Sequence, residues 1–419
     1  MQRARRIEAR HNNEGKRMAR AIEEIIVIGG SHAGLFAATA LKKAGFRVRV
    51  FERAPEVLRG TGAGIRIQPL MADLLKREVG IDLANASTRT RFDRHLAPRP
   101  QAIGNKIVFE QAEDGQFASW GSLYRALLKD FGLERYHCGA AAIDAHQTAN
   151  RVTVRFASGR EEAADLVVFA DGIASTGRRR LMPAARMQYS GYVAWRGLTP
   201  ESDLSNGTRA VLKDARVVVI PKLSHVMLYP VPGEHDAIAE GERRFNGIWY
   251  RNVAEGKVLD ELMTDRDGIR RPTTVAEGAM QPHHVAAFRR DVEAELPPAV
   301  AEVLLKPEPF VTPIYDVEPS RMVFGRQILL GDAAAATRPH VSASTAKAMR
   351  AAYGLAAALQ DAASQDAVES RLAAWEAKHL AIAWEFTRRG RAIGQRLQAD
   401  GTFVPGAPEN TQITMPVDC

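Results

Sequence analysis

Residues 25–34 read IIVIGGSHAG, and this stretch decides the fold of the 419-residue chain. Four apolar residues in a row predict a buried parallel strand, and the glycines that follow predict a tight turn. Residues 35–43 are rich in alanine with helical spacing, and Gly45 marks the end of that helix. Residues 48–51 read VRVF and predict a second strand. A strand, a helix and a strand within about thirty residues form the βαβ unit of dinucleotide-binding folds.

The turn of this unit has the composition of a pyrophosphate-binding loop. Such a loop needs small residues where the backbone approaches phosphate, and a helix start whose free N–H groups face the anion. Glu52 ends the second strand, at about the 20-residue spacing expected of an acid that binds an adenosine ribose. A tight turn without a ligand is the alternative. We expect cofactor contacts from Gly29, Gly30, Ser31, Ala33 and Gly34, with Ser31 at the place of the usual middle glycine.

Two later motifs place polar side chains after predicted strands. Residues 330–334 read LGDAA, in which glycine lets a ligand approach the backbone and Asp332 can accept hydrogen bonds from a polyol. Residues 170–175 read ADGIAS and contain Asp171, with Arg178 just beyond. Taken alone, each motif is typical of an ordinary turn.

The hydrophobic pattern predicts an α/β protein, α+β overall, with two main units. Residues 151–170 predict a small β meander that returns to the main sheet. Between 188 and 282, short strand-like pieces alternate with Pro and Gly turns, which predicts a mostly antiparallel sheet. We therefore expect a disordered basic tail (1–23), a discontinuous Rossmann-like FAD-binding domain (24–187 and 283–366), an inserted substrate domain (188–282), and a C-terminal helix and tail (367–419).

Composition excludes several classes of protein. The formal net charge of +8 comes partly from the N-terminal tail and is not interleaved with aromatic residues, so we expect steering of anionic cofactors and no nucleic acid. No apolar run reaches membrane-spanning length, so we expect no membrane partner. Two cysteines, Cys138 and Cys419, predict no structural disulfide and fit a cytoplasmic protein. No Cys/His cluster has zinc spacing, and we expect no metal site.

The three motifs, in this order and spacing, resemble the flavoprotein aromatic hydroxylases, the single-component monooxygenases related to p-hydroxybenzoate hydroxylase. The resemblance covers residues 25–405 and implies bound FAD, NADH or NADPH as electron donor, and a homodimer. It implies that Asp171 serves both FAD and the nicotinamide donor, and that Asp332 holds the ribityl chain. The residues carried over to the ADP part of FAD are Gly29, Gly34 and Glu52. Arg53, next to Glu52, and Arg178, just beyond the Asp171 motif, are carried over as neighbours.

Longer stretches are similar to the branch of the family that acts on hydroxylated pyridines. They are GAGI at 62–65, SGYVAWRG at 190–197, YPVPG at 229–233 and NVAEG at 252–256. The resemblance implies O₂-dependent hydroxylation of a small aromatic substrate through a flavin C4a-hydroperoxide, with 2,6-dihydroxypyridine giving 2,3,6-trihydroxypyridine. The same chemistry on 6-hydroxynicotinate or a hydroxybenzoate is one alternative. A non-hydroxylating FAD protein or nucleotide sensor is the other.

Three residues are candidates for the substrate side of the site. His225 and Tyr229 are four residues apart in a strand-like stretch, so both face the same side of the sheet. His340 lies in the loop after Asp332, which is expected to face the flavin. By resemblance all three lie beside the substrate, and an imidazole suits removal of a hydroxyl proton near neutral pH. The alternative is an exposed His225 and a Tyr229 that only fills the core.

Residues near the flavin ring form the last group of candidates. By resemblance they are Arg66, Pro339, Ser344 and Thr345. The family has glycines near Ser344 and Thr345, where backbone N–H groups meet the flavin ring. Because β-branched Thr345 tolerates unusual backbone angles poorly, we expect altered flavin seating and weaker FAD retention. We expect the adjacent His283 and His284 to point apart at the surface.

Overall fold

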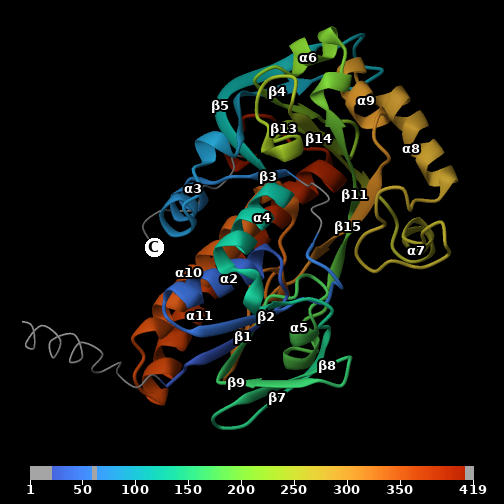
Figure 1. The fold of residues 1–419 in the computed structure, drawn as a ribbon. Helices are drawn as coiled ribbons and strands as arrows, with labels where there is room; N and C mark the ends of the chain where they lie inside the picture. Colours follow the sequence, from blue (N-terminus) through green and yellow to red (C-terminus); the bar gives the residue numbers. More distant parts are fainter. Residues whose placement is uncertain (1–20, 59–63, 411–419) are drawn as a thin grey trace, which may run out of the picture.

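The computed structural model describes residues 21–58 and 64–410. Figure 1 shows a large sheet at the top, a second sheet below it, and two long helices running between them. Most of the expected basic tail (1–20), the tip of the glycine-rich loop (59–63) and the C-terminal end with Cys419 (411–419) lie outside the described residues. Ile22, within the expected tail, is buried in the core. Within 21–58 and 64–410, no helix is long and apolar enough to cross a membrane.

The lower sheet has six strands in the order β16-β17-β10-β1-β2-β6. Its central strand β1 is parallel to β2 on one side and to β10 on the other. The four apolar residues of β1 are therefore buried, which confirms the predicted Rossmann-like unit. The strands are β1 (Glu24–Ile28), β2 (Arg47–Phe51), β6 (Tyr136–His137), β10 (Leu166–Phe169), β16 (Val323–Phe324) and β17 (Gln327–Leu329).

Helices and a small meander complete this unit. Alanines on α2 allow close packing against both α4 and α10. The helices are α2 (His32–Lys43), α3 (Pro69–Leu74), α4 (Trp120–Phe131), α5 (Thr176–Leu181), α10 (Ser344–Gln360) and α11 (Gln365–Gln395). The predicted meander is a three-stranded antiparallel sheet of β7 (Ala142–Gln147), β8 (Val152–Phe156) and β9 (Glu161–Ala164).

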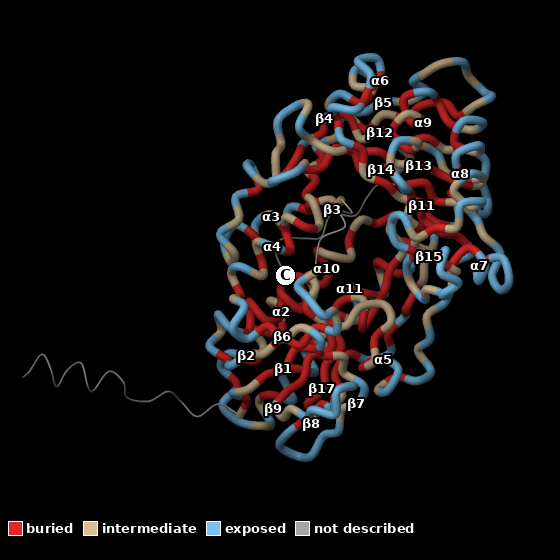
Figure 2. Tube along the Cα trace, turned by 45° about the vertical axis from the view of Figure 1, so that its right-hand side comes forward, coloured by how far each residue is buried: buried red, intermediate tan, exposed pale blue. Residues whose placement is uncertain are grey.

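The upper sheet has eight strands in the order β15-β11-β14-β13-β12-β4-β5-β3. Its neighbours are antiparallel except for the parallel pair β12 and β4. Figure 2 shows that the strands of both sheets are mostly buried, whereas the outer loops are exposed. The strands are β3 (Gly64–Arg66), β4 (Thr88–Leu96), β5 (Ile107–Ser119), β11 (Gln188–Pro200), β12 (Ala215–Val219), β13 (His225–Val231), β14 (Arg244–Asn252) and β15 (Phe310–Asp316).

The two faces of the upper sheet carry different side chains. Trp195 and Trp249 pack on the helix side, where Trp195 stacks on Phe288 of α8 with ring centroids 4.6 Å apart. Because side chains alternate along a strand, their neighbours in sequence point to the opposite face. That face carries Tyr192, Tyr229 and Tyr250, and a cavity lies between it and the start of α10. The helices of the upper unit are α6 (Asn206–Leu212), α7 (Lys257–Leu262), α8 (Pro282–Glu295) and α9 (Pro298–Leu305).

The upper unit takes in more of the chain than the expected inserted domain (188–282). β3, β4 and β5 come from the segment assigned to the first part of the FAD-binding domain. α8, α9 and β15 come from the segment assigned to its second part, yet they pack on the upper sheet. The buried positions of β4 carry residues such as Asp93 and His95, so no apolar alternation marks this strand in the sequence.

Candidate active site

A cavity of about 760 Å³ lies where the strands β1, β2 and β10 end. The carboxyl ends of parallel strands are where nucleotides bind in this type of sheet. Nine of the predicted cofactor residues line the cavity, namely Gly29, Ser31, Ala33, Glu52, Arg53, Asp171, Asp332, Ser344 and Thr345. The three motifs, far apart in sequence, therefore meet at one cleft.

At each glycine of the first motif, a side chain would collide with neighbouring atoms. Gly29 has φ +98°, and a Cβ there would lie 2.4 Å from the carbonyl oxygen of Ala170. A Cβ on Gly34 would lie 1.8 Å from the carbonyl oxygen of Gly29. A Cβ on Gly30 would meet the hydroxyl of Tyr136 at 2.2 Å. Gly30 and Gly34 do not line the cavity, so their contribution is to let the turn and α2 pack closely.

Glu52 is a buried carboxylate held by the backbone of the turn. Its two oxygens accept hydrogen bonds from the backbone N–H of Gly30 (2.7 Å) and of Ala54 (2.9 Å). The side chain is 6% exposed and lines the cavity. A carboxylate has lone pairs left after two such bonds, so it can also accept from a ribose hydroxyl.

We expect Glu52→Gln to weaken FAD binding about tenfold. The substitution removes one charged acceptor, and it places an amide N–H₂ group opposite a backbone N–H, where two donors meet. We expect this to cost about 1.5 kcal/mol of binding free energy. Fluorescence titration of the apoprotein with FAD measures the change in Kd. The exposed Glu277 provides a matched control, since Glu277→Gln removes the same charge at a residue that does not line the cleft. An unchanged Kd in Glu52→Gln would contradict a ribose-binding role.

The Asp-Gly and Gly-Asp loops follow the neighbouring strands β10 and β17 and both line the cleft. Asp171 accepts from the backbone N–H of Thr176 (2.6 Å) and Gly177 (3.3 Å), while its second oxygen, Oδ1, is buried without a partner among the described residues. Burial raises the pKa of Asp171, and burial also raises the pKa of Asp332 against the opposing charges of Lys347 and Arg178. Two half-buried carboxylates that line the cleft, beside a glycine turn, fit the hydroxyls of FAD.

Arg178 is placed differently from the prediction. Its side chain is 2% exposed and does not line the cavity. The guanidinium donates to the carbonyl oxygens of Ile173, Asp332 (3.2 Å) and Ala333 (3.1 Å). Arg178 therefore holds the Asp-Gly loop against the Gly-Asp loop. It positions the residues that line the cleft without lining it itself.

The loop before α10 connects the cleft to the upper sheet. Ser344 and Thr345 line the cleft and also a second cavity of about 140 Å³, which Arg66 and Pro339 line as well. Both residues lie in the first turn of α10, where the backbone angles are ordinary for any residue. The backbone difficulty expected at Thr345 is therefore wrong. Ser342 carries the left-handed conformation instead, with φ +48°.

A cluster of histidines and tyrosines lies where this loop, which contains His340, meets the cavity face of the upper sheet. The rings of His225 and His340 are 5.0 Å apart, and His225 stacks on Tyr250 at 4.5 Å. The hydroxyl of Tyr192 is 2.7 Å from Nε2 of His340. Both histidines line a third cavity of about 520 Å³. Tyr229 lines the second cavity, stacks on Phe117 and donates to the carbonyl oxygen of Gly64 (3.1 Å).

Burial changes the proton affinity of this cluster. Burial and the nearby positive charge of Arg216 lower the pKa of His225 to about 3. Burial lowers the pKa of His340 well below its usual value, with further effects of His225 and Arg338. Burial raises the pKa of Tyr229 to about 12. The expectation of an imidazole that titrates near neutral pH is therefore wrong for this state, and both rings are neutral. The alternative of an exposed His225 is excluded, since it is 5% exposed.

Comparison with known proteins agrees with this geometry. Residues 27–74 match the NAD(P)-binding Rossmann-like domain, and residues 189–316 match the FAD binding domain-like family. A relative named 2,6-dihydroxypyridine 3-monooxygenase, of Paenarthrobacter nicotinovorans, is 36% identical over 93% of this chain and 96% of its own. The chain belongs to the FAD-binding aromatic hydroxylase family. Enzymes of this family are FAD-dependent monooxygenases that use NAD(P)H, so this hydroxylase has FAD as its cofactor.

One solved structure and one further relative are also similar to this hydroxylase. The solved structure of 2,6-dihydroxypyridine-3-hydroxylase from Arthrobacter nicotinovorans superposes with a TM-score of 0.88 at 34% identity, covering 96% of this chain and 99% of that one. A 6-hydroxynicotinate 3-monooxygenase of Bordetella bronchiseptica is 26% identical over 82% of this chain and 84% of its own.

Four site residues of the hydroxylase were not predicted. Tyr192, Tyr250 and Arg196 lie on the cavity face of the upper sheet, and Gln398 reaches it from the C-terminal end of α11. The alternation of β11 could have indicated Arg196, since it lies four residues from Tyr192 on the same face. The Nε of Arg196 is buried without a hydrogen-bond partner among the described residues. No local signal marks Gln398.

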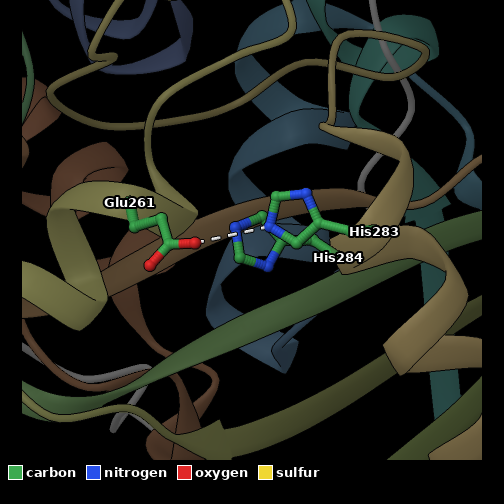
Figure 3. A group of neighbouring side chains, drawn as sticks. All are labelled: Glu261, His283 and His284. Carbon is green, nitrogen blue, oxygen red and sulfur yellow. Dashed lines mark ion pairs between the residues drawn. The ribbon is translucent and has the colours of Figure 1, made fainter.

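One exposed group could bring metal-type ligands together. Glu261, His283 and His284 have ligand atoms within 4.8 Å of one another, and Figure 3 shows the ion pair from Glu261 to His283 (3.4 Å). The two imidazoles lie 4.0 Å apart, so the expectation that they point apart is wrong. His283 and His284 lie in the first turn of α8, and both imidazoles point toward Glu261. None of the three lines a cavity described above.

We expect the free energy of unfolding to fall as pH decreases from about 6.5, the usual histidine pKa. The pKa of His32 is lowered to about 4 and that of His225 to about 3, chiefly by burial. The unfolded chain therefore takes up protons that the folded chain refuses, at up to about 1.4 kcal/mol per pH unit for each histidine. Urea denaturation at pH 7, 6 and 5 measures this loss. A constant stability over that range would contradict neutral, buried imidazoles.

Proposed function

We propose that this enzyme hydroxylates a hydroxylated pyridine, with 2,6-dihydroxypyridine giving 2,3,6-trihydroxypyridine. The observation that carries the proposal is the position of the His225–His340 cluster. It lies beside the 339–345 loop, and Ser344 and Thr345 of that loop also line the nucleotide cleft. A ring held at the cluster would thus be next to a flavin that extends from the cleft. The identity to a dihydroxypyridine monooxygenase supports this substrate class.

The polar groups around the cluster suit an electron-rich ring. Bound FAD, once reduced by NAD(P)H, supplies the activation of oxygen. The protein binds and orients the ring and keeps water out. Neutral imidazoles with a low pKa are weak bases and good hydrogen-bond donors, so His225 and His340 stabilise an already ionised ring oxygen. Arg196 lies on the same face and contacts the Tyr250 hydroxyl. Its guanidinium adds positive charge there.

The charges of the cavity of about 520 Å³ favour a substrate without a carboxylate. Arg216 lies 2.7 Å from Asp93 and 3.3 Å from Glu113, and Arg66 lies 2.5 Å from Glu113. These two arginines are neutralised by their partners, so neither is available for a substrate carboxylate. Arg196 is the observation that supports the second candidate, 6-hydroxynicotinate or a hydroxybenzoate, because a carboxylate could pair with it.

The test is NADH oxidation by the FAD-loaded enzyme with 2,6-dihydroxypyridine, 6-hydroxynicotinate and 4-hydroxybenzoate, with product analysis by mass. We expect 2,6-dihydroxypyridine to stimulate oxidation most and to give a product heavier by one oxygen atom. Stimulation without that product would make the pyridine an effector only. A better substrate among the two carboxylates would assign the second candidate. No stimulation by any ring would favour a non-hydroxylating flavoprotein.

We further propose a homodimer that works in the cytoplasm, in pyridine or nicotine breakdown. The family resemblance supports each part of this proposal. Exposed apolar residues at the β4–β5 hairpin, Ile103, Ile107 and Val108, offer a surface for a second copy. Light scattering after size-exclusion chromatography measures the mass in solution, and a monomer would contradict the dimer.

A further inference from the structure

Gln398 is a buried polar residue that the proposed function does not use. It lies in a π-helical turn, η8 (Arg396–Asp400), that continues α11, and it is 5% exposed. The side-chain amide of Asn252, at the end of β14, donates to the backbone carbonyl oxygen of Gln398 at 2.7 Å. Single π turns occur often at functional sites because they redirect side chains out of the helical register. Here the turn brings Gln398 to β13.

The side chain of Gln398 contacts one nitrogen of His225. Its amide Nε2 lies 2.9 Å from Nδ1 of His225. An amide nitrogen can only donate, so Nδ1 must accept. A neutral imidazole carries one proton, and the bond made by one ring nitrogen decides where that proton resides. The ring is neutral because burial and Arg216 disfavour its charged form. The proton of His225 is therefore on Nε2.

The rest of the environment leaves that proton available to a ligand. The ring of His225 lies against Tyr250 at an interplanar angle of 15°, which fixes its plane. It lines the cavity of about 520 Å³. Among the described residues no hydrogen bond is made to its Nε2. His340, the other titratable group in ring contact with it, is already hydrogen-bonded to Tyr192.

We propose that Gln398 is a positioning residue that holds His225 in the tautomer with the proton on Nε2, and so makes His225 a hydrogen-bond donor to a ring oxygen of the bound substrate. The substrate part of this inference rests on the proposed function. The tautomer part does not. If the amide of Gln398 were reversed, its oxygen would accept from Nδ1–H, and His225 would present an acceptor instead. The two arrangements differ in a measurable property of the substrate-free protein.

The experiment combines ¹⁵N NMR of histidine-labelled, FAD-loaded enzyme with steady-state kinetics. The signals of His225 are assigned by their loss in His225→Gln. Gln398→Met removes the hydrogen bond at similar size, and Gln398→Glu supplies a carboxylate that accepts from Nδ1–H. Gln395→Met is the matched control, because Gln395 lies three residues away and binds the exposed Asp400 at 2.9 Å.

We expect an unprotonated Nδ1 and a protonated Nε2 in the wild type, a mixture in Gln398→Met, and a protonated Nδ1 in Gln398→Glu. We expect kcat/KM for 2,6-dihydroxypyridine to fall about tenfold in Gln398→Met and about a hundredfold in Gln398→Glu, with the Kd for FAD unchanged. Gln395→Met should match the wild type in both measurements.

Two results would overturn the proposal. A protonated Nδ1 in the wild type would show that the amide is reversed, and wild-type kcat/KM in both Gln398 variants would show that the tautomer has no effect on turnover. If the wild type hydroxylates none of the three rings, the proposed function fails, whereas the NMR spectra still decide the tautomer.

Discussion

Gly34→Ala is expected to abolish FAD binding at micromolar concentrations of FAD and to lower the Tm. The added Cβ would lie 1.8 Å from the carbonyl oxygen of Gly29, and backbone atoms cannot move aside as a flexible side chain can. The start of α2 must then shift away from β1, which misaligns the N–H groups that face the pyrophosphate. A cost of about 3 kcal/mol corresponds to about a hundredfold in the Kd for FAD. Fluorescence titration and thermal unfolding measure the two effects.

Gly207→Ala is the matched control for this substitution. Gly207 lies in α6, and a Cβ there meets no atom within 4 Å. Alanine is favoured over glycine in a helix by about 1 kcal/mol, so this variant should be as stable as the wild type or more stable. It should bind FAD normally. Wild-type affinity in Gly34→Ala would mean that the turn does not approach the cofactor as closely as proposed.

His340→Leu is expected to lower kcat/KM for the ring substrate by about a hundredfold while FAD remains bound, the scale of one lost hydrogen bond to a charged group. The imidazole lines the substrate cavity and bonds the hydroxyl of Tyr192 at 2.7 Å. Leucine keeps the apolar volume but removes the donor, and it leaves the Tyr192 hydroxyl without this partner. Kinetics with 2,6-dihydroxypyridine and the flavin absorbance of the purified protein test both statements.

His379→Leu separates this effect from the general cost of losing a buried histidine. His379 is 4% exposed, packs on Trp375 at 5.1 Å, and burial lowers its pKa to about 4. Burial also lowers the pKa of His340. It lines none of the three cavities. We expect a change in Tm without a change in kcat/KM. An equal loss of turnover in both variants would mean that His340 acts through stability alone.

The nucleotide half of the site follows from local sequence. Gly29 and Glu52 were predicted from strands that end at a turn, Asp171 and Asp332 from the family resemblance of their motifs, and all four line one cavity. Parallel strands bring their carboxyl ends to the same edge, so short motifs suffice to predict where they meet. Even in this half, only the tertiary structure shows that Arg178 donates to carbonyl oxygens of the Asp-Gly loop and the Gly-Asp loop.

The substrate half depends on contacts between distant segments. The two-residue period of a strand predicted that His225 and Tyr229 share a face, but it could not predict that His340, Tyr250 and Gln398 meet them there. Nor could it predict the proton affinity of the histidines. A pKa depends on burial and on neighbouring charges, and both are properties of the assembled structure.

The sequence by itself determined the βαβ unit, the family and the cofactor, because each rests on short motifs, and the residues within one motif are close together in the chain. The tertiary structure decided which strands build the upper sheet, how its arginines are paired, and that its two central histidines are neutral. β4 shows why: its inward residues include Asp93, which bonds His95 on its own strand and Arg216 on the neighbouring strand β12, so this strand does not follow an apolar pattern. Hydrogen bonds between buried polar groups form only when the partners are brought together, so their pattern along one strand predicts neither the strand nor its neighbours.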